Sequence, residues 1–514
     1  MQPADRAKDE NQGCRPGDSA TVTPTSFSHK DFRNYRRRLH RCLHVLAQML
    51  DHLAFDEERP MTGLELEIYL MDRETLAPTM RNREVLGLLK GGELERIFQE
   101  ELGRFNIEAN VPPRLLAGTG LAEYEEFLRN ALNTTDAKAA EIGAGLVVIG
   151  ILPTVMPEHT VIENISSNPR YGDLNRQILD ARGDDVVIDI LGERERLQIQ
   201  TESIMPEAAN TSVQFHLQVT PATFADYWNA SQAIAGVQVA VGANSPFLFG
   251  RRLWDETRVA LFEQTTDTRP EELRNQDVRP RVWFGERWIT SIFDLFEENI
   301  RFYPPLLPIL DEEDPDDALA AGRVPHLGEL RLHNGTVYRW NRPVYDISDG
   351  RPHLRVENRV VSAGPTVVDM LANAAFYFGL VRGLVASERP LWSQLTFEAA
   401  KRNFNVACQR GLDAPQEWPR AGELTAADLV LERLLPVAHD GLSAFGVDPA
   451  LRDRLLGIIE RRCVLGRNGA VWQTETVSRL EETGLDRSAA LRAMLRKYIE
   501  YMHSNAPVHT WPVG

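Results

Sequence analysis

The sequence predicts an α+β fold in which a mainly stranded part precedes an all-helical part. Stretches with the apolar–polar alternation typical of β-strands cluster within the first 360 residues. Apolar residues at helical spacing fill most of the chain from residue 365 onward. Runs of strands followed by runs of helices are typical of α+β proteins. We therefore expect a tail over 1–29, a main domain over 30–388 and a helical region over 389–514 that packs on it.

The first predicted elements are a tail and a helix. Residues 1–29 are rich in Asp, Gly, Pro, Ser and Thr and lack the apolar run of a secretory signal. This composition predicts disorder. Leucines then recur every three or four residues, which predicts a helix over residues 31–53.

The strand predicted over residues 63–70 has the most informative pattern of the chain. Four apolar residues alternate there with Gly63, Glu65, Glu67 and Tyr69. Two carboxylates on one face of a strand repel each other unless a cation or a basic group lies between them. The pattern therefore predicts a cation held against a sheet.

The remaining elements follow in order along the chain. Further strands are predicted over residues 106–110, 146–152, 186–191, 211–219, 336–340 and 353–361. Helices are predicted over residues 92–102, 120–145, 221–243 and 365–387, and over most of the chain after residue 390.

Several of these strands place possible metal ligands on their polar faces. Glu108, His216 and Glu357 join Glu65 and Glu67 in this set. Carboxylate oxygens suit Mg²⁺ or Mn²⁺, and one imidazole is tolerated. A single glutamate on a strand usually belongs to a solvated face. The coincidence of several such residues favours a divalent-metal site.

Arginines form a second group of candidate residues. They stand in Tyr338-Arg339-Trp340-Asn341-Arg342, around Glu357 at Arg355 and Arg359, and in Gly250-Arg251-Arg252 with Arg258 further on. Carboxylate-held metal together with arginines is what phosphoryl transfer requires. Surface ion pairing is the competing interpretation for any single arginine. The sequence has no GxxxxGK[ST] loop, so a bound nucleotide would depend on metals and arginines.

Composition restricts the partners and the cellular location. The net charge of −17 argues against nucleic acid or an anionic membrane as a partner. The four cysteines include no CxxC pair, and a reducing cytoplasm is the simplest location. No apolar run reaches the ~18 residues of a membrane span.

Several short motifs together resemble the bacterial glutamate–cysteine ligase family 2. These carboxylate–amine ligases are related in fold to glutamine synthetase. The resemblance lies in Gly63-Leu64-Glu65-Leu66-Glu67, Ile149-Gly150-Ile151-Leu152-Pro153-Thr154, Asn244-Ser245-Pro246-Phe247-Leu248-Phe249-Gly250, Arg355-Val356-Glu357-Asn358-Arg359 and Ala363-Gly364-Pro365-Thr366-Val367-Val368-Asp369-Met370.

The resemblance implies both an architecture and a reaction. It implies a curved antiparallel sheet whose concave face binds Mg-ATP and amino acids, with residues 30–388 as the catalytic domain. ATP would phosphorylate the γ-carboxylate of L-glutamate. The amine of L-cysteine would then attack the acyl phosphate to give γ-glutamylcysteine, the first product on the way to glutathione.

The resemblance also implies roles for individual residues. Glu65 and Glu67 look like ligands of two different metal ions, with Glu108 as a shared or adjacent ligand. His216 and Glu357 look like the other ligands of the site at the nucleotide phosphates. Contacts to phosphate, acyl phosphate or a substrate carboxylate are implied for Arg339 and Arg359 as the catalytic pair and for Arg342, Arg251 and Arg258.

One departure from the family pattern leaves the acceptor open. Gln214 stands where many relatives carry the first histidine of a His-x-His pair, and it is a poorer metal ligand. The alternatives are the same activation of glutamate with a different amine, or a non-catalytic ligand-sensing relative. The retained carboxylates argue against a decayed site, because unpaired charges on a sheet are costly. The oligomeric state is also open, with a homo-oligomer as one option.

Overall fold

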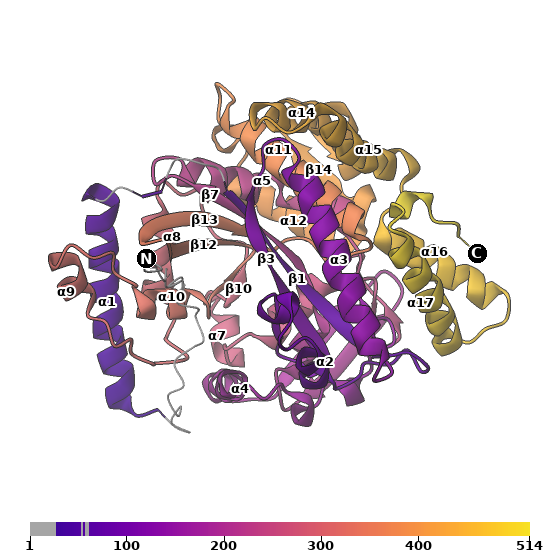
Figure 1. Ribbon diagram of the computed structural model, residues 1–514, viewed down its shortest axis with the longest axis horizontal. Coiled ribbons are helices and arrows are strands. Elements are labelled where there is room, and N and C mark those ends of the chain that lie inside the picture. The colour runs from indigo at the N-terminus through magenta and orange to yellow at the C-terminus, as the bar shows by residue number, and fades with distance from the viewer. Residues whose placement is uncertain (1–26, 53–54, 57–60, 514) are drawn as a thin grey trace, which may run out of the picture.

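A seven-stranded antiparallel sheet forms the centre of the molecule. The computed structural model describes residues 27–52, 55–56 and 61–513 (Figure 1). Strand order in the sheet is β12-β13-β7-β1-β3-β2, and β4 pairs with the far end of β1. All pairings in this sheet are antiparallel. Its strands are β1 (Met61–Asp72), β2 (Phe98–Glu100), β3 (Asn106–Leu115), β4 (Ala144–Val147), β7 (Val213–Val219), β12 (Asn341–Ser348) and β13 (Arg351–Asn358).

The two faces of the sheet differ because side chains alternate along each strand. The apolar positions of β1, β7 and β13 lie in the main hydrophobic cluster, among them Leu64, Leu66, Phe215, Leu217 and Val356. The helices on this face include α3 (Gly120–Ala140), α5 (Phe224–Gly242) and α11 (Val367–Val385). The polar positions face the other way. The predicted α+β class and the antiparallel sheet are therefore confirmed.

The other elements before residue 360 are short helices and small two-stranded pairs. The helices are α2 (Asn82–Leu88), α4 (Pro169–Arg182), α6 (Thr257–Thr265), α7 (Glu271–Asn275), α8 (Ile292–Phe302), α9 (Pro315–Ala320) and α10 (Gly328–Asn334). The paired strands are β5 (Val186–Leu191) with β6 (Arg196–Thr201), β8 (Phe247–Leu248) with β9 (Arg251–Arg252), and β10 (Val282–Trp283) with β11 (Tyr338–Arg339).

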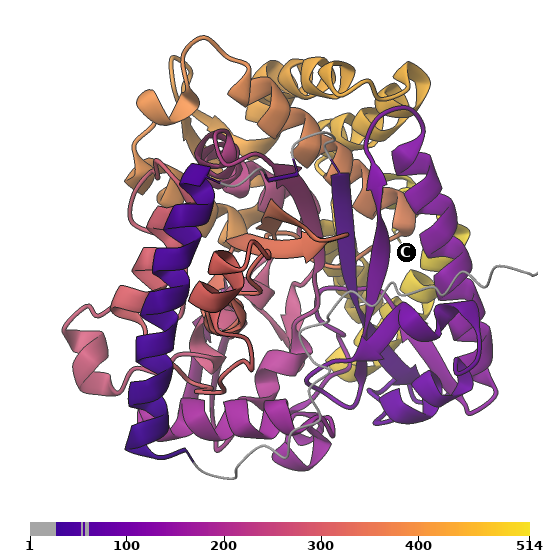
Figure 2. The same cartoon turned by 60° about the vertical axis from the view of Figure 1, so that its left-hand side comes forward.

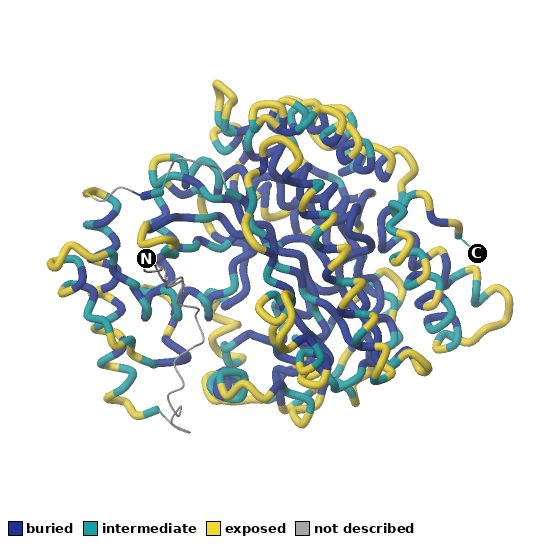
Figure 3. The backbone as a smooth tube through the Cα atoms, viewed as in Figure 1, coloured by how far each residue is buried: buried dark blue, intermediate teal, exposed yellow. Residues whose placement is uncertain are grey.

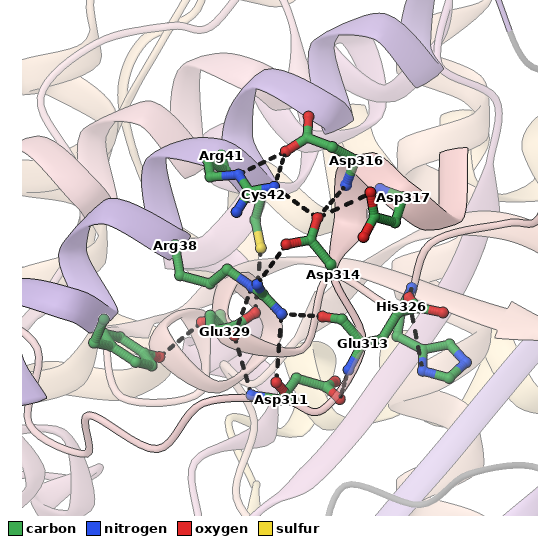
Figure 4. Close-up of polar contacts among 11 residues, drawn as sticks. Arg38, Arg41, Cys42, Asp311, Glu313, Asp314, Asp316, Asp317, His326 and Glu329 are labelled. Carbon is green, nitrogen blue, oxygen red and sulfur yellow. Dashed lines mark hydrogen bonds and ion pairs between the residues drawn. The ribbon is translucent and has the colours of Figure 1, made fainter. Parts of the chain in front are cut away.

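The N-terminal helix α1 (His29–His52) lies along α8, α9 and α10, as Figures 1 and 2 both show. The tail predicted over residues 1–29 lies, up to residue 26, outside the described residues. The apolar side of α1 is buried, and its basic side is held by acidic groups (Figure 4). Arg38 Nη1 lies 2.8 Å from Asp314 Oδ2, and Arg38 Nε lies 3.2 Å from the buried Glu329 Oε1. Cys42 Sγ donates to Glu329 Oε2 at 3.3 Å.

Most of the C-terminal part packs on α5 and α11 and shares their hydrophobic cluster, whereas the buried apolar residues of its last two helices lie in a second cluster. It contains α12 (Phe397–Arg410), α13 (Ala426–Leu429), α14 (Leu435–Ala444), α15 (Pro449–Leu465), α16 (Gly469–Glu482) and α17 (Arg487–Ser504). A β-hairpin of β14 (Pro415–Trp418) and β15 (Gly422–Thr425) interrupts the predicted all-helical stretch. Figure 3 shows buried backbone running from the sheet into these helices.

Helix α11 is long and apolar enough to cross a membrane, but the fold accounts for its composition. Of the span Val367–Val385, 89% of the apolar window is buried inside the protein. It is covered by α5, α14, α15 and α3. The apolar composition of α11 is therefore that of a helix buried in the protein core.

Three predicted elements were wrong in type or length. The helix predicted over 92–102 is a short 3-10 turn, η1 (Glu93–Arg96), followed by β2, because Phe98 pairs with Ala109 of β3. The strand predicted over 146–152 ends at Val147. Beyond it, the Val148 carbonyl accepts a hydrogen bond from the Tyr498 hydroxyl and the Gly150 carbonyl accepts one from the Thr211 nitrogen, so neither continues the pairing with β1. The strand predicted over 336–340 shrinks to β11, and β12 was not predicted.

Candidate active site

The polar face of the sheet gathers the five residues predicted as metal ligands. On β1, Glu67 lies opposite Glu108 of β3, and Glu65 lies two residues away on the same face. On the other side of β1, His216 of β7 lies opposite Glu357 of β13. Directly opposed residues of antiparallel strands point to the same face. The strand register therefore places all five side chains in one row across three neighbouring strand pairs.

Glu65 and His216 are in direct contact. Glu65 Oε1 lies 3.1 Å from His216 Nε2. Gly63 is paired with His216, and a Cβ at position 63 would lie 3.3 Å from the His216 Cβ, so glycine leaves room for the imidazole. Burial raises the pKa of Glu65, but the His216 ring and the guanidiniums of Arg342 and Arg359 outweigh burial and hold the pKa well below its usual range. The Glu65 carboxylate is therefore charged at neutral pH.

Glu67 is fixed by neutral hydrogen-bond donors. Its Oε2 accepts from the Ser212 backbone nitrogen at 2.6 Å and from Ser212 Oγ at 3.1 Å. Its Oε1 accepts from Gln214 Nε2 at 3.1 Å. Burial raises the pKa of Glu67 more than Arg359 and these donors lower it. Glu65 and Glu67 thus differ in charge behaviour, although they lie two residues apart on one strand.

Glu357 binds the two arginines at one end of the row. Arg342 donates to Glu357 Oε2 from Nε at 3.0 Å and from Nη2 at 2.8 Å. Arg359 Nη1 donates to Glu357 Oε1 at 2.7 Å and to Gln214 Oε1 at 2.8 Å. Burial raises the pKa of Glu357, but Arg342 and Arg359 outweigh it, so the pKa lies below its ordinary value. Gln214 therefore connects Arg359 to Glu67.

Carboxyl groups accumulate at the opposite end of the row. Glu108 Oε2 accepts from Gln99 Nε2 at 2.7 Å. Burial, followed by Glu65, Glu101 and Glu67, raises the pKa of Glu108 well above its usual range. Burial and then Glu67 raise the pKa of Glu101 to about 7. Burial and then Glu101 raise the pKa of Glu207 to about 8. This end of the site carries more carboxyl groups than its surroundings can keep ionised.

Sequence reasoning missed Glu101 because the sequence predicts a helix over residues 92–102, and it missed Glu207 because that residue lies in no predicted element. Glu101 directly follows β2, and Glu207 lies in the 3-10 turn η4 (Met205–Ala209). A signal existed for Glu207, which is a lone charge among Met, Pro and Ala. Asn106 and Asn210 were also missed, and their side-chain amides are buried without a hydrogen-bond partner among the described residues. Such amides offer donors and acceptors to a ligand.

The donor chemistry of the row fits a hard divalent cation. It consists of carboxylate oxygens and one imidazole, whose Nε2 contacts Glu65 and whose Nδ1 is buried without a hydrogen bond within the described chain. Burial, and after it the nearby carboxyl groups of Glu65, Glu101 and Glu67, raise the pKa of Glu108, and a bound cation would favour its ionised form. However, no three His, Cys, Asp or Glu side chains of the described residues converge on a common metal position. The carboxylates instead contact His216, Gln214, Arg342 and Arg359.

Arg339, predicted as a catalytic contact, is buried beside α8. Its Nη2 lies 3.1 Å from Glu298 Oε2 and 3.0 Å from Asn299 Oδ1. Its guanidinium also lies over the ring of Trp283, 5.5 Å from the centroid. No contact joins it to the row of carboxylates within the described chain. The structure therefore gives Arg339 partners that the local sequence pattern could not indicate.

Arg258 and Arg251 make no hydrogen bond or ion pair with the row within the described chain, although Arg258 lies close enough to lower the pKa of Glu67. Arg258 is buried, lies 2.9 Å from Glu256, and donates to the Val360 carbonyl at 2.6 Å. It therefore holds the segment next to Arg359 and does not present a free guanidinium. Arg251 is exposed on β9, and its nearest carboxylate is Glu195 at 3.9 Å. Of the predicted arginines, the structure brings Arg342 and Arg359 to the acidic row.

Comparisons with known proteins agree with this fold. The family model of glutamate-cysteine ligase family 2 (GCS2) matches residues 61–479. The fold is similar to a crystal structure of glutamate–cysteine ligase from Francisella tularensis in complex with AMP, with a TM-score of 0.52 at 12% identity over 88% of this chain and 90% of that one. It is also similar to a bifunctional glutathione synthetase from Pasteurella multocida, with a TM-score of 0.50 at 12% identity over 91% of this chain and 54% of that one. No curated protein sequence matches.

Proposed function

The chain belongs to glutamate-cysteine ligase family 2 and is a carboxylate–amine ligase, and on this premise we propose that it uses ATP to join the γ-carboxylate of L-glutamate to the amine of L-cysteine. The observation that carries the proposal is the row of charged side chains on one sheet face. Glu65 and Glu357 lie there beside His216, Arg342 and Arg359. Ionised carboxylates next to arginines on rigid strands suit the handling of phosphate.

The proposed reaction has two steps. A γ-carboxylate oxygen of glutamate attacks the γ-phosphorus of ATP, the bond to the bridging oxygen breaks, and ADP leaves. The amine nitrogen then attacks the carbonyl carbon of the acyl phosphate, and the carbon–oxygen bond to phosphate breaks. The nitrogen gives up a proton, which the released phosphate can accept. Phosphorylation is needed because a carboxylate oxygen is otherwise a poor leaving group.

The arginines have the clearest role in the first step. Charge develops on the transferred phosphoryl group, and fixed guanidiniums stabilise such charge in a site from which water is excluded. Arg359 is held in place by Glu357, Gln214 and the backbone, since its own nitrogen donates to the Trp340 carbonyl at 2.9 Å. Arg342 retains a partly exposed side chain, so it can also reach a ligand.

The metal belongs to the proposal as well. Mg²⁺ or Mn²⁺, when bound, would bridge and neutralise phosphate oxygens, and the residues that would hold it are Glu65, Glu67, Glu108, His216 and Glu357. The carboxyl groups among these side chains differ in how easily they ionise, and only the ionised form binds a metal well. The neighbours of Glu65 and Glu357 lower the pKa of these two groups, whereas burial and nearby carboxyl groups raise the pKa of Glu108.

A coupled assay of ADP release tests the proposal. The full-length chain is given ATP, Mg²⁺, L-glutamate and one amine from a panel that includes L-cysteine. ADP formed in the presence of cysteine, with γ-glutamylcysteine as the product by mass spectrometry, supports the proposed reaction. ADP formed only with another amine retains the glutamate activation and replaces the acceptor. Nucleotide binding without turnover on any amine would contradict the enzyme assignment. The Arg359→Gln variant, assayed in the same way, measures the ADP release that does not depend on the proposed site.

A further inference from the structure

A cavity of about 470 Å³ lies on the helical side of the molecule, away from the row of charged residues. Its walls come from α3, the start of α11, α15 and residues 504–509 after α17. It shares no lining residue with the candidate active site. Residues 504–509 also lie beyond the segment 61–479 that the family model matches. The volume lies within the roughly 300–1,000 Å³ of small-molecule sites.

The charged groups of this cavity leave an excess of positive charge. Arg454 of α15 pairs with Glu125 of α3 through its Nη2 and Glu125 Oε2. Arg129, one helical turn after Glu125, is exposed and makes no hydrogen bond or ion pair with any described residue. Two guanidiniums therefore face one carboxylate. An arginine fork without an internal partner is suited to an external carboxylate or phosphate.

The polar part of the wall is held in place. Asn505 has a left-handed backbone conformation with φ of 56°, at the C-terminal end of α17. Its Oδ1 accepts from the Val368 nitrogen at 3.0 Å, and its Nδ2 donates to Glu125 Oε1 at 3.1 Å. Both Glu125 oxygens are thus occupied by the protein. His509 adds a buried Nδ1 that has no hydrogen-bond partner within the described chain.

The rest of the wall is apolar. Val368, Ile458 and Pro507 line the cavity next to the charged groups. Inorganic phosphate would use the arginines but leave these side chains without a partner. A ligand with one carboxylate and a short branched hydrocarbon chain would use both parts of the wall.

We propose that this cavity is a second ligand site that binds a small organic monocarboxylate. The carboxylate is held by Arg129 and Arg454, and the hydrocarbon chain packs on Val368, Ile458 and Pro507. Glu125 competes with the ligand for Arg454, and it thereby sets the affinity. The proposal goes beyond the ligase reaction and does not depend on it.

Ligand-observed NMR titration of the full-length protein with 4-methylpentanoate tests this site. We expect saturable binding with a millimolar or lower Kd, and none of comparable strength for the uncharged isostere 4-methylpentanamide. Arg129→Gln and Arg454→Gln should each weaken binding at least fivefold. Arg433→Gln is the matched control, because it removes the same charge at an exposed position that does not line the cavity.

Glu125→Gln gives the sharpest readout. It should tighten binding two- to fivefold, because Arg454 loses its charged partner while Asn505 keeps an acceptor. A purely structural role for Glu125 would leave the affinity unchanged or lower it. Absence of binding to the wild type, equal weakening by Arg433→Gln, or tighter binding of inorganic phosphate than of 4-methylpentanoate would each overturn the proposal.

Discussion

Glu65 and Glu108 show how two carboxyl groups on one sheet face acquire opposite properties. Glu65 has an imidazole within 3.1 Å and guanidiniums nearby, and its pKa is lowered despite burial. Glu108 has a neutral amide as its hydrogen-bond partner and other carboxyl groups around it, and its pKa is raised. Burial raises the pKa of both groups; the basic neighbours of Glu65 reverse that effect, whereas the carboxyl neighbours of Glu108 add to it.

Glu65→Gln should reduce turnover at least 100-fold while the fold stays intact. The substitution keeps the size of the side chain and removes the negative charge beside His216. We would measure ADP release together with the thermal unfolding midpoint. Glu74→Gln is the control, since Glu74 is exposed in the turn after β1. Activity within a few-fold of the wild type would remove Glu65 from the proposed site.

Arg359→Gln and Arg251→Gln should have very different effects on kcat/KM. Arg359 contacts Glu357 and Gln214 within the row, so its loss should lower kcat/KM at least 100-fold. Arg251 is exposed and lies 3.9 Å from its nearest carboxylate, so its loss should change kcat/KM less than twofold. Steady-state kinetics of both variants checks this pair. A large decrease of kcat/KM in Arg251→Gln would show that Arg251 does contact a substrate.

The residues of the candidate site could be predicted from the sequence where they lie on alternating strands. Alternation along β1, β7 and β13 was enough to place Glu65, His216 and Glu357 on polar faces. It could not reveal that Arg339 turns toward Glu298, because that contact joins segments that are distant in sequence. Nor could it find Glu101, because the sequence predicts a helix over residues 92–102, whereas in the structure Glu101 directly follows β2.

At the scale of elements, α1 is attached by a buried ion pair and a surrounding ionic network. Glu329 of α10 has a side chain only 1% exposed, and its carboxylate receives Arg38, Cys42 and the Asp311 nitrogen. Burial raises the pKa of Glu329, although these partners oppose the shift. The helix was predictable from its leucines, but its docking partner was not, because the acidic segment lies far along the chain.

Arg38→Met should lower the free energy of unfolding by about 3 kcal/mol. Removal of one partner of a buried pair leaves the other charge without compensation, which typically costs about 3–5 kcal/mol, and the 17% exposure of Arg38 favours the lower value. Arg37→Met is the control, because Arg37 is exposed one residue earlier. Urea unfolding of both variants measures the difference. Equal losses would show that the ion pair contributes nothing specific.

His333 of α10 should make the protein sensitive to mild acid. It is buried, its Nε2 lies 2.9 Å from the Asn299 carbonyl oxygen, and burial lowers its pKa from 6.5 to about 4. The unfolded chain therefore binds more protons than the folded chain between these pH values. The free energy of unfolding falls as pH falls through this window, by up to about 3 kcal/mol. Urea unfolding at several pH values should show a shallower slope for His333→Gln, and an unchanged slope would exclude His333 as a source.

At the scale of the whole molecule, one hydrophobic cluster joins the sheet, α5 and α11 to the helices α12, α13, α14 and α15. The sequence suggested a boundary near residue 388, because strands stop and helices take over. Sequence alone could not show how much apolar surface each side supplies to the other.

A chain that ends at residue 388 should not fold cooperatively. Helix α12 covers α5, and α14 and α15 cover α11, so truncation exposes the apolar surface of both core helices. Solubility and urea unfolding of the truncated chain check this expectation against the full-length protein. A soluble product with one cooperative transition would show that the first 388 residues form an independent domain.

Strand order also has a consequence for synthesis on the ribosome. β1 lies between β3, which soon follows it, and β7, which begins at Val213; β7 in turn waits for β13, which begins at Arg351. A nascent chain therefore displays an incomplete sheet with open edges while much of the protein is still untranslated. Such edges pair readily with other chains. Chaperones that shield exposed strands during translation should therefore determine the yield of this protein more than its final stability does.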